Sequence, residues 1–113
     1  MKIYGLKTCD TCRKARRALP AAEFVDIRAD RMPDVLLEAA WQAFGAVLLN
    51  TRSTTWRNLP EAEREEPPLT LIRRHPALMK RPLIDGEKGS EKGSEGGGPL
   101  FLGWSGDVQA ALV

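Results

Sequence analysis

A Cys-x-x-Cys spacing, Cys9 to Cys12, stands between a predicted strand and a predicted helix. Residues 2–5 favour β-structure, and residues 7–10 have the composition of a turn. After the turn, small and apolar residues recur on one face of a predicted helix: Cys12, Ala15, Ala18, Leu19 and Ala22. Two cysteines at the junction of a strand and a helix indicate thiol redox chemistry.

The predicted position of Cys9 at a helix start gives the two thiols different roles. Unpaired N–H groups and the positive end of the helix dipole favour an anion there, so the pKa of Cys9 should fall below about 8.5. Lys7 and Arg13 would add to this effect if their side chains point toward the sulfur. Cys12 lies one turn further in, within reach of a disulfide. We therefore expect Cys9 to attack and Cys12 to resolve the mixed disulfide. The alternative is a pair of buried helix residues without chemistry.

Composition limits the other classes of function. The 113 residues fit one domain, and a net charge of +2 gives little support for direct binding to nucleic acid. No apolar run approaches the roughly 20 residues of a membrane helix, and no signal peptide is evident, so we expect a cytoplasmic protein without a membrane partner. Cys9, Cys12 and the single histidine, His75, are too few for a structural zinc site, so no metal is predicted.

The remaining elements alternate in a recognisable order. Strands are predicted near 24–27, 81–85 and 100–104, with helices at 33–44, around 60–66, around 69–72 and after Ser105. The order is β-α-β, a helical middle of about 33–80, then β-β-α, which is the order of a thioredoxin-type core. The predicted fold class is therefore α/β: one thioredoxin-like domain over 1–113, with a mixed four-stranded sheet and a helical insertion between its βαβ and ββα halves. The Glu-Lys-Gly-Ser repeats of about 86–98 are interpreted as an enlarged, flexible hairpin loop.

Two further segments could contribute to the cysteine site. In thioredoxin-like folds a cis-proline begins the third strand and faces the cysteine loop, and Arg81-Pro82 fits this position. Arg81 could then hold a carboxylate or an oxyanion, or it could be a surface residue before an edge strand. The polar stretch 50–57 could line the site, or it could be a loop anchored by Trp56. His75, next to a proline, is interpreted as a turn residue.

Several short motifs together resemble the ArsC/Spx family, which includes arsenate reductases and redox-sensing regulators, and most closely a small arsenate-reductase-like branch. They are residues 3–5 with 7–15, then 48–52, 75–76 and 80–84. The resemblance implies Cys9 as nucleophile and Arg81 as one of three arginines around an oxyanion. Asn50, with Arg52 near it, and Gly103 stand at the positions of the other two arginines.

The resemblance also implies a function. The expected activity is that of a monomeric thiol reductase without a bound cofactor, using glutathione as co-substrate and acting on a small oxyanion or a mixed disulfide. The alternative is an Spx-like regulator that senses oxidation and binds the RNA polymerase α subunit. The residues that would contact substrate, besides the catalytic Cys9, Cys12 and Arg81, are Lys7, Thr8, Asp10, Thr11, Arg13, Asn50, Arg52 and Pro82.

Overall fold

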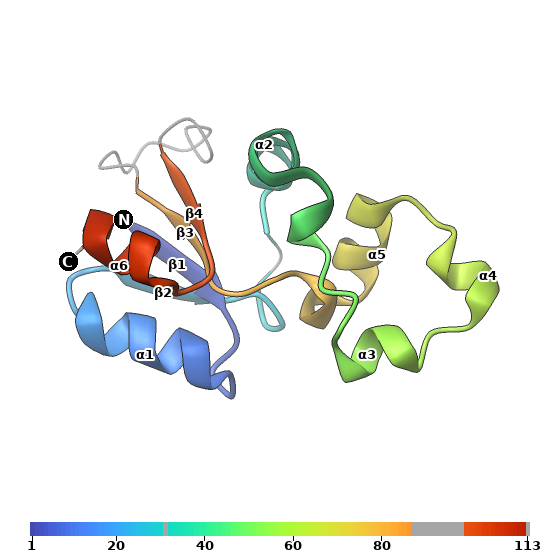
Figure 1. Cartoon of the computed structure of the whole chain (residues 1–113), viewed down its shortest axis with the longest axis horizontal. Coiled ribbons are helices and arrows are strands. Elements are labelled where there is room, and N and C mark those ends of the chain that lie inside the picture. Colours follow the sequence, from blue (N-terminus) through green and yellow to red (C-terminus); the bar gives the residue numbers. More distant parts are fainter. Residues whose placement is uncertain (31, 87–98, 113) are drawn as a thin grey trace.

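The computed structural model describes residues 1–30, 32–86 and 99–112 (Figure 1). The elements follow in the order β1 (Lys2–Gly5), α1 (Asp10–Ala18), β2 (Glu23–Asp26), α2 (Asp34–Phe44), α3 (Thr54–Arg57), α4 (Glu61–Arg64), α5 (Pro68–Arg74), β3 (Leu83–Asp85), β4 (Leu100–Leu102) and α6 (Gly106–Leu112). Two 3₁₀ turns, η1 (Gly45–Leu48) and η2 (Pro76–Leu78), follow α2 and α5.

The four strands form one mixed sheet in the order β2-β1-β3-β4. β1 pairs with β2 in parallel, Ile3 opposite Phe24, and with β3 in antiparallel, Ile3 opposite Ile84. β4 pairs antiparallel with β3. The carboxyl ends of β1 and β2 therefore meet at one edge of the sheet, where β3 begins, and the loop carrying Cys9 leaves β1 at that edge.

Alternation of side chains along the strands divides the core into two clusters, one on each face of the sheet. Ile3 and Ile84 lie under α1 and α6, where Ala15 is fully buried and Val108 packs against them. The larger cluster begins on the opposite face of the sheet with Tyr4 and Leu83 and continues among α2, α5 and the two 3₁₀ turns. Its other members include Leu36, Leu37, Leu48, Leu71, Ile72, Leu78 and Met79. In Figure 1, α1 lies on one side of the sheet and α2 on the other, while α3, α4 and α5 extend away from it.

The predicted fold class is confirmed: the chain has a thioredoxin-like α/β fold with a helical segment between its two halves. Two local predictions were wrong. The first helix begins at Asp10 with Cys9 at the capping position, as expected, but it ends at Ala18, so Leu19 and Ala22 lie beyond it, because Pro20 disfavours helical backbone at Leu19. The helix α3 was not predicted, because its polar sequence has no apolar period; its start is instead stabilised by Ser53, whose Oγ accepts from the Trp56 N–H at 3.1 Å.

The last helix is capped as the sequence suggests, since Ser105 Oγ accepts a hydrogen bond from the Val108 N–H at 3.4 Å. β3 and β4 form an antiparallel pair that is closed by a hydrogen bond from Gly86 N–H to Pro99 O at 2.8 Å. The predicted hairpin loop of about 86–98 lies, apart from Gly86, outside the described residues. Among the described helices, none is long and apolar enough to cross a membrane.

Candidate active site around Cys9

The turn between β1 and α1 places Cys9 at the helix start. The Cys9 N–H donates to Leu6 O at 3.1 Å, which closes the turn, and Cys9 O accepts from the Arg13 N–H at 3.0 Å, which begins the helix. Cys9 has extended backbone angles, φ −85° and ψ 121°, as a residue just before a helix does. Its side chain is half-buried, while that of Cys12 is fully buried. The thiol of Cys9 is therefore the accessible one of the pair.

The surroundings of Cys9 favour its thiolate. Burial raises the pKa of Cys9, but four interactions with Cys12 and Arg81 oppose burial and outweigh it. The backbone N–H and the thiol of Cys12 hydrogen-bond to the sulfur, and Arg81 adds a hydrogen bond and its positive charge. The net pKa of Cys9 is lowered, which is the property of a reactive thiol.

Cys12 has the opposite behaviour. The pKa of Cys12 is raised to about 11, chiefly by burial and further by hydrogen bonding to Cys9 and the charge of its thiolate. The backbone of Leu6 and the charge of Arg81 act in the other direction without cancelling it. At neutral pH Cys12 therefore keeps its proton and can donate it in a hydrogen bond to the Cys9 sulfur.

Gly5, at the end of β1, makes room for Cys12. A Cβ built on Gly5 would lie well inside van der Waals contact of Cys12 Sγ and 3.3 Å from Cys12 Cβ. Both atoms are fully enclosed, so neither can move aside freely. Gly5 belongs to a motif of the resemblance, but no structural role was predicted for it, because the approach of helix α1 can be seen only in three dimensions.

We predict that Gly5→Ala destabilises the fold by about 1–3 kcal/mol, because an added methyl group overpacks the contact between β1 and Cys12. Urea unfolding measures the loss. Gly106→Ala is the matched control, because a Cβ there meets nothing within 4 Å, and its free energy of unfolding should not fall. Equal stability of Gly5→Ala and the natural chain would contradict the proposed contact.

Arg81 lies beside Cys9 and is held by backbone carbonyls. Its Nη1 donates to Ala77 O at 2.7 Å and to Met79 O at 3.4 Å. The Arg81–Pro82 bond is cis, as expected, and Pro82 is fully buried. Arg81 Nε is buried and has no hydrogen-bond acceptor among the described residues. The carbonyl of Ala77, which positions the guanidinium, could not be found from sequence, because any residue type can supply it.

The other residues of the cysteine turn point elsewhere. Arg13 Nε donates to Lys7 O at 3.0 Å, and the Arg13 guanidinium lies 3.6 Å from the Asp10 carboxylate. The two cations expected to assist Cys9, Lys7 and Arg13, instead line a separate hollow beside α1 with Arg16 and Arg17. Thr8 and Asp10 are exposed and Thr11 is half-buried.

The stretch from Asn50 to Trp56 folds as a capped turn followed by a packed helix. Asn50 Oδ1 accepts from the Arg52 N–H at 3.1 Å, and the side chains of Asn50 and Arg52 line a hollow with Lys80. Cys9 is not among the residues that line this hollow. Trp56 packs against the larger core cluster, which supports its interpretation as the anchor of this loop.

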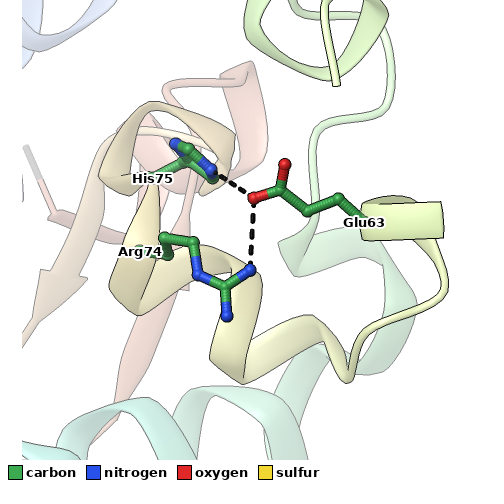
Figure 2. Close-up of polar contacts among 3 residues, drawn as sticks. All are labelled: Glu63, Arg74 and His75. Atoms are coloured by element: carbon green, nitrogen blue, oxygen red, sulfur yellow. Dashed lines mark hydrogen bonds and ion pairs between the residues drawn. The ribbon is translucent and has the colours of Figure 1, made fainter. Parts of the chain in front are cut away.

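Two further positions have structural explanations. Gly103 has φ +80°, a conformation that disfavours residues with a Cβ, so the backbone itself selects glycine where the resemblance led us to expect arginine. His75 lies in the turn between α5 and η2, and its ring contacts Glu63 Oε1 at 2.9 Å (Figure 2). Arg74 reaches the same oxygen at 3.2 Å, and both hydrogen bonds lower the pKa of Glu63, that from His75 the more.

A cysteine pair at the start of the first helix, next to a cis-proline on a β2-β1-β3-β4 sheet, defines a thioredoxin-like protein. The model of the ArsC family matches residues 4–95, so the chain belongs to the ArsC family. This is a thiol reductase-like family.

The chain is also similar to individual known proteins. An uncharacterised protein of Haemophilus influenzae is 38% identical over 91 residues, which cover 73% of this chain and 80% of that protein. The structure of the YffB (PA3664) protein superposes with a TM-score of 0.74 at 30% identity, covering 98% of this chain and 96% of the other. An arsenate reductase (ArsC) related protein from Brucella melitensis gives a TM-score of 0.62 at 28% identity, covering 97% and 91%.

Proposed function

We propose that the protein is a glutathione-linked thiol reductase in which the Cys9 thiolate attacks the sulfur of a mixed disulfide. The observation that carries the proposal is the contrast between the two thiols. The accessible one, Cys9, has a lowered pKa, and the buried one, Cys12, has a pKa raised to about 11. One thiol is thereby prepared as nucleophile and the other as hydrogen-bond donor.

The reaction balances with glutathione as the reductant. The Cys9 thiolate attacks a glutathionylated substrate, a new Cys9–glutathione disulfide forms, and the substrate leaves as a thiolate that takes a proton from solvent. A second glutathione thiolate then attacks the glutathione sulfur of the Cys9 adduct. Oxidised glutathione leaves, and Cys9 returns as a thiolate. Overall, the mixed disulfide and one glutathione thiol give a substrate thiol and oxidised glutathione. The glutathione supplies the two electrons that reduce the substrate sulfur.

Arg81 fits the role of a group that touches both nucleophile and substrate. Its charge and hydrogen bond favour the Cys9 thiolate, and its buried Nε–H has no acceptor in the described part of the chain. A carboxylate or oxyanion on the substrate would be attracted by the positive charge of this guanidinium. Small oxyanions remain a second substrate class in this proposal, although only Arg81 of the three expected arginines is present at its position.

The competing function is an Spx-like redox sensor that binds the RNA polymerase α subunit. In a sensor, Cys9 and Cys12 form a disulfide directly, and the protein turns over no substrate. A reductase assay with the mixed disulfide of glutathione and 2-mercaptoethanol distinguishes the two, because a sensor shows no turnover and is retained by immobilised polymerase. Our proposal predicts steady formation of oxidised glutathione and no retention.

We expect Cys12→Ser to keep most of this turnover, because the serine hydroxyl still donates a hydrogen bond to Cys9 and glutathione supplies the second thiol. The rate of oxidised glutathione formation measures the effect. If Cys12 is instead the resolving thiol, turnover collapses and mass spectrometry detects the trapped Cys9–glutathione adduct. That result would replace glutathione with Cys12 in the second step.

A further inference from the structure

A hollow lined by arginines lies near Ala77, the residue whose carbonyl accepts a hydrogen bond from Arg81. One part, of about 400 Å³, has Ile27, Met32, Leu37 and Ile72 in its walls, together with Arg28, Arg73 and Arg74. A second part, of about 250 Å³, is lined by residues that include Arg28, Arg74, His75 and Ala77. The two parts share Arg28, Arg74 and Pro76 in their linings, so they are adjacent, and together they are called the hollow below.

The hollow combines an apolar floor with a cationic rim. Ile27, Leu37 and Ile72 are buried, whereas Arg28, Arg73 and Arg74 are exposed. Volumes of this size are typical of sites for small molecules, in which apolar walls bind the body of a ligand and a few polar groups orient it. The ligand that fits is a small organic anion.

The acids near the hollow leave one arginine free. Asp34 pairs with Arg73 at 3.1 Å, and Glu63 pairs with Arg74 and His75 (Figure 2). The Arg28 side chain has no ion-pair partner among the described residues. Its backbone is fixed by a hydrogen bond from Arg28 N–H to Asp26 Oδ1 at 2.9 Å. Arg28 therefore presents a guanidinium without an ion-pair partner in the described part of the chain, on a turn that the Asp26 carboxylate fixes through the Arg28 backbone, and a guanidinium of this kind suits the recognition of a carboxylate.

Arg81 connects this hollow to the reactive sulfur. Its guanidinium hydrogen-bonds to Cys9 and donates to the carbonyl of Ala77, whose residue lines the hollow. Because one planar group interacts with the sulfur and also donates to the Ala77 carbonyl at 2.7 Å, the sulfur and the hollow lie within the reach of a few peptide residues, which span roughly 3.3–3.6 Å each. A thiol tripeptide could therefore reach both.

We propose that the hollow is the carboxylate subsite for the thiol co-substrate, with Arg28 contacting one carboxylate of a glutathione-like tripeptide while its sulfur faces Cys9. This inference rests on the proposed glutathione-linked function and adds where the co-substrate is held. It assigns Arg28 a role in binding and none in the chemistry at sulfur.

Binding of S-methylglutathione tests the subsite without any thiol exchange. Isothermal titration with the natural chain should detect this probe, and its dimethyl ester, which lacks both carboxylates, should bind about tenfold or more weakly. Arg28→Gln should weaken binding of the acid about tenfold, equivalent to about 1.4 kcal/mol, and leave binding of the ester unchanged. Arg57→Gln, an exposed arginine of α3 that lines neither part of the hollow, is the matched control and should change neither affinity.

Three results would overturn the subsite: no binding of S-methylglutathione to the natural chain, equal binding of acid and ester, or an Arg28→Gln variant that binds both as the natural chain does. Repeating the titration with Cys9→Ser separates this inference from the proposed function. The variant cannot turn over substrate, yet it should bind S-methylglutathione as the natural chain does. If the natural chain binds S-methylglutathione but shows no reductase activity, the proposed function fails and the subsite stands. If the natural chain shows reductase activity but does not bind S-methylglutathione, the subsite fails and the proposed function stands.

Discussion

Cys9→Ser abolishes reduction of the glutathione mixed disulfide, by more than about a thousandfold in kcat/KM. The nucleophile must be a thiolate, and a serine hydroxyl in the same place neither ionises near neutral pH nor forms a disulfide. No other accessible thiol can replace it, because the second cysteine, Cys12, is fully buried and has a pKa raised to about 11. The measurement is the coupled assay of oxidised glutathione formation.

The matched control for this variant is Cys12→Ser, which makes the same exchange of sulfur for oxygen one helical turn away. Both variants should unfold at nearly the temperature of the natural chain, so that a loss of activity reports chemistry. Residual turnover by Cys9→Ser within a factor of about ten of the natural chain would exclude Cys9 as the nucleophile.

Arg81→Gln has the second large effect: it raises the pKa of Cys9 and slows every reaction of its thiolate at pH 7. Arg81 supplies both a hydrogen bond and a positive charge to the sulfur, and burial, which raises the pKa, remains when they are removed. A higher pKa leaves a smaller fraction of Cys9 as thiolate at pH 7. The rate of Cys9 alkylation at pH 7 therefore falls several-fold in the variant. Alkylation by iodoacetamide, followed by peptide mapping, measures it.

Lys80→Gln controls for the loss of a positive charge. Lys80 precedes Arg81 in the chain and is exposed, and it is not among the groups that shift the Cys9 pKa. Its alkylation profile should match that of the natural chain. If the two variants shift the profile equally, the effect comes from net charge, and the specific contact between Arg81 and Cys9 is excluded.

Sequence patterns predicted the order of strands and helices well, because strands, helix caps and prolines are specified by neighbouring residues. The strand-turn-helix around Cys9, the proline at 82 and the cap at Ser105 all depend on neighbouring residues, and all are found where expected. The apolar face of the first helix was predicted to continue to Ala22, yet the helix ends at Ala18, because Pro20 follows.

The surroundings of the site could be predicted only in part, because they depend on contacts between distant segments. The ordering of the two thiols follows from a helix start, a local feature, whereas the cations around Cys9 do not. Lys7 and Arg13 are its neighbours in sequence, yet Arg13 turns to the Lys7 carbonyl, and the effective cation is Arg81, about seventy residues further along the chain. Likewise, nothing local indicated that Arg28 and Arg74 line one hollow.

The most direct test of the account is the rate of Cys9 alkylation by iodoacetamide in the natural chain, measured from pH 5 to pH 10 beside an unstructured peptide that contains one cysteine. Cys12 should stay unmodified until well above neutral pH, so the profile reports one thiol. The account predicts an inflection for Cys9 below that of the peptide, which lies at about 8.5. An inflection at or above that of the peptide would contradict it.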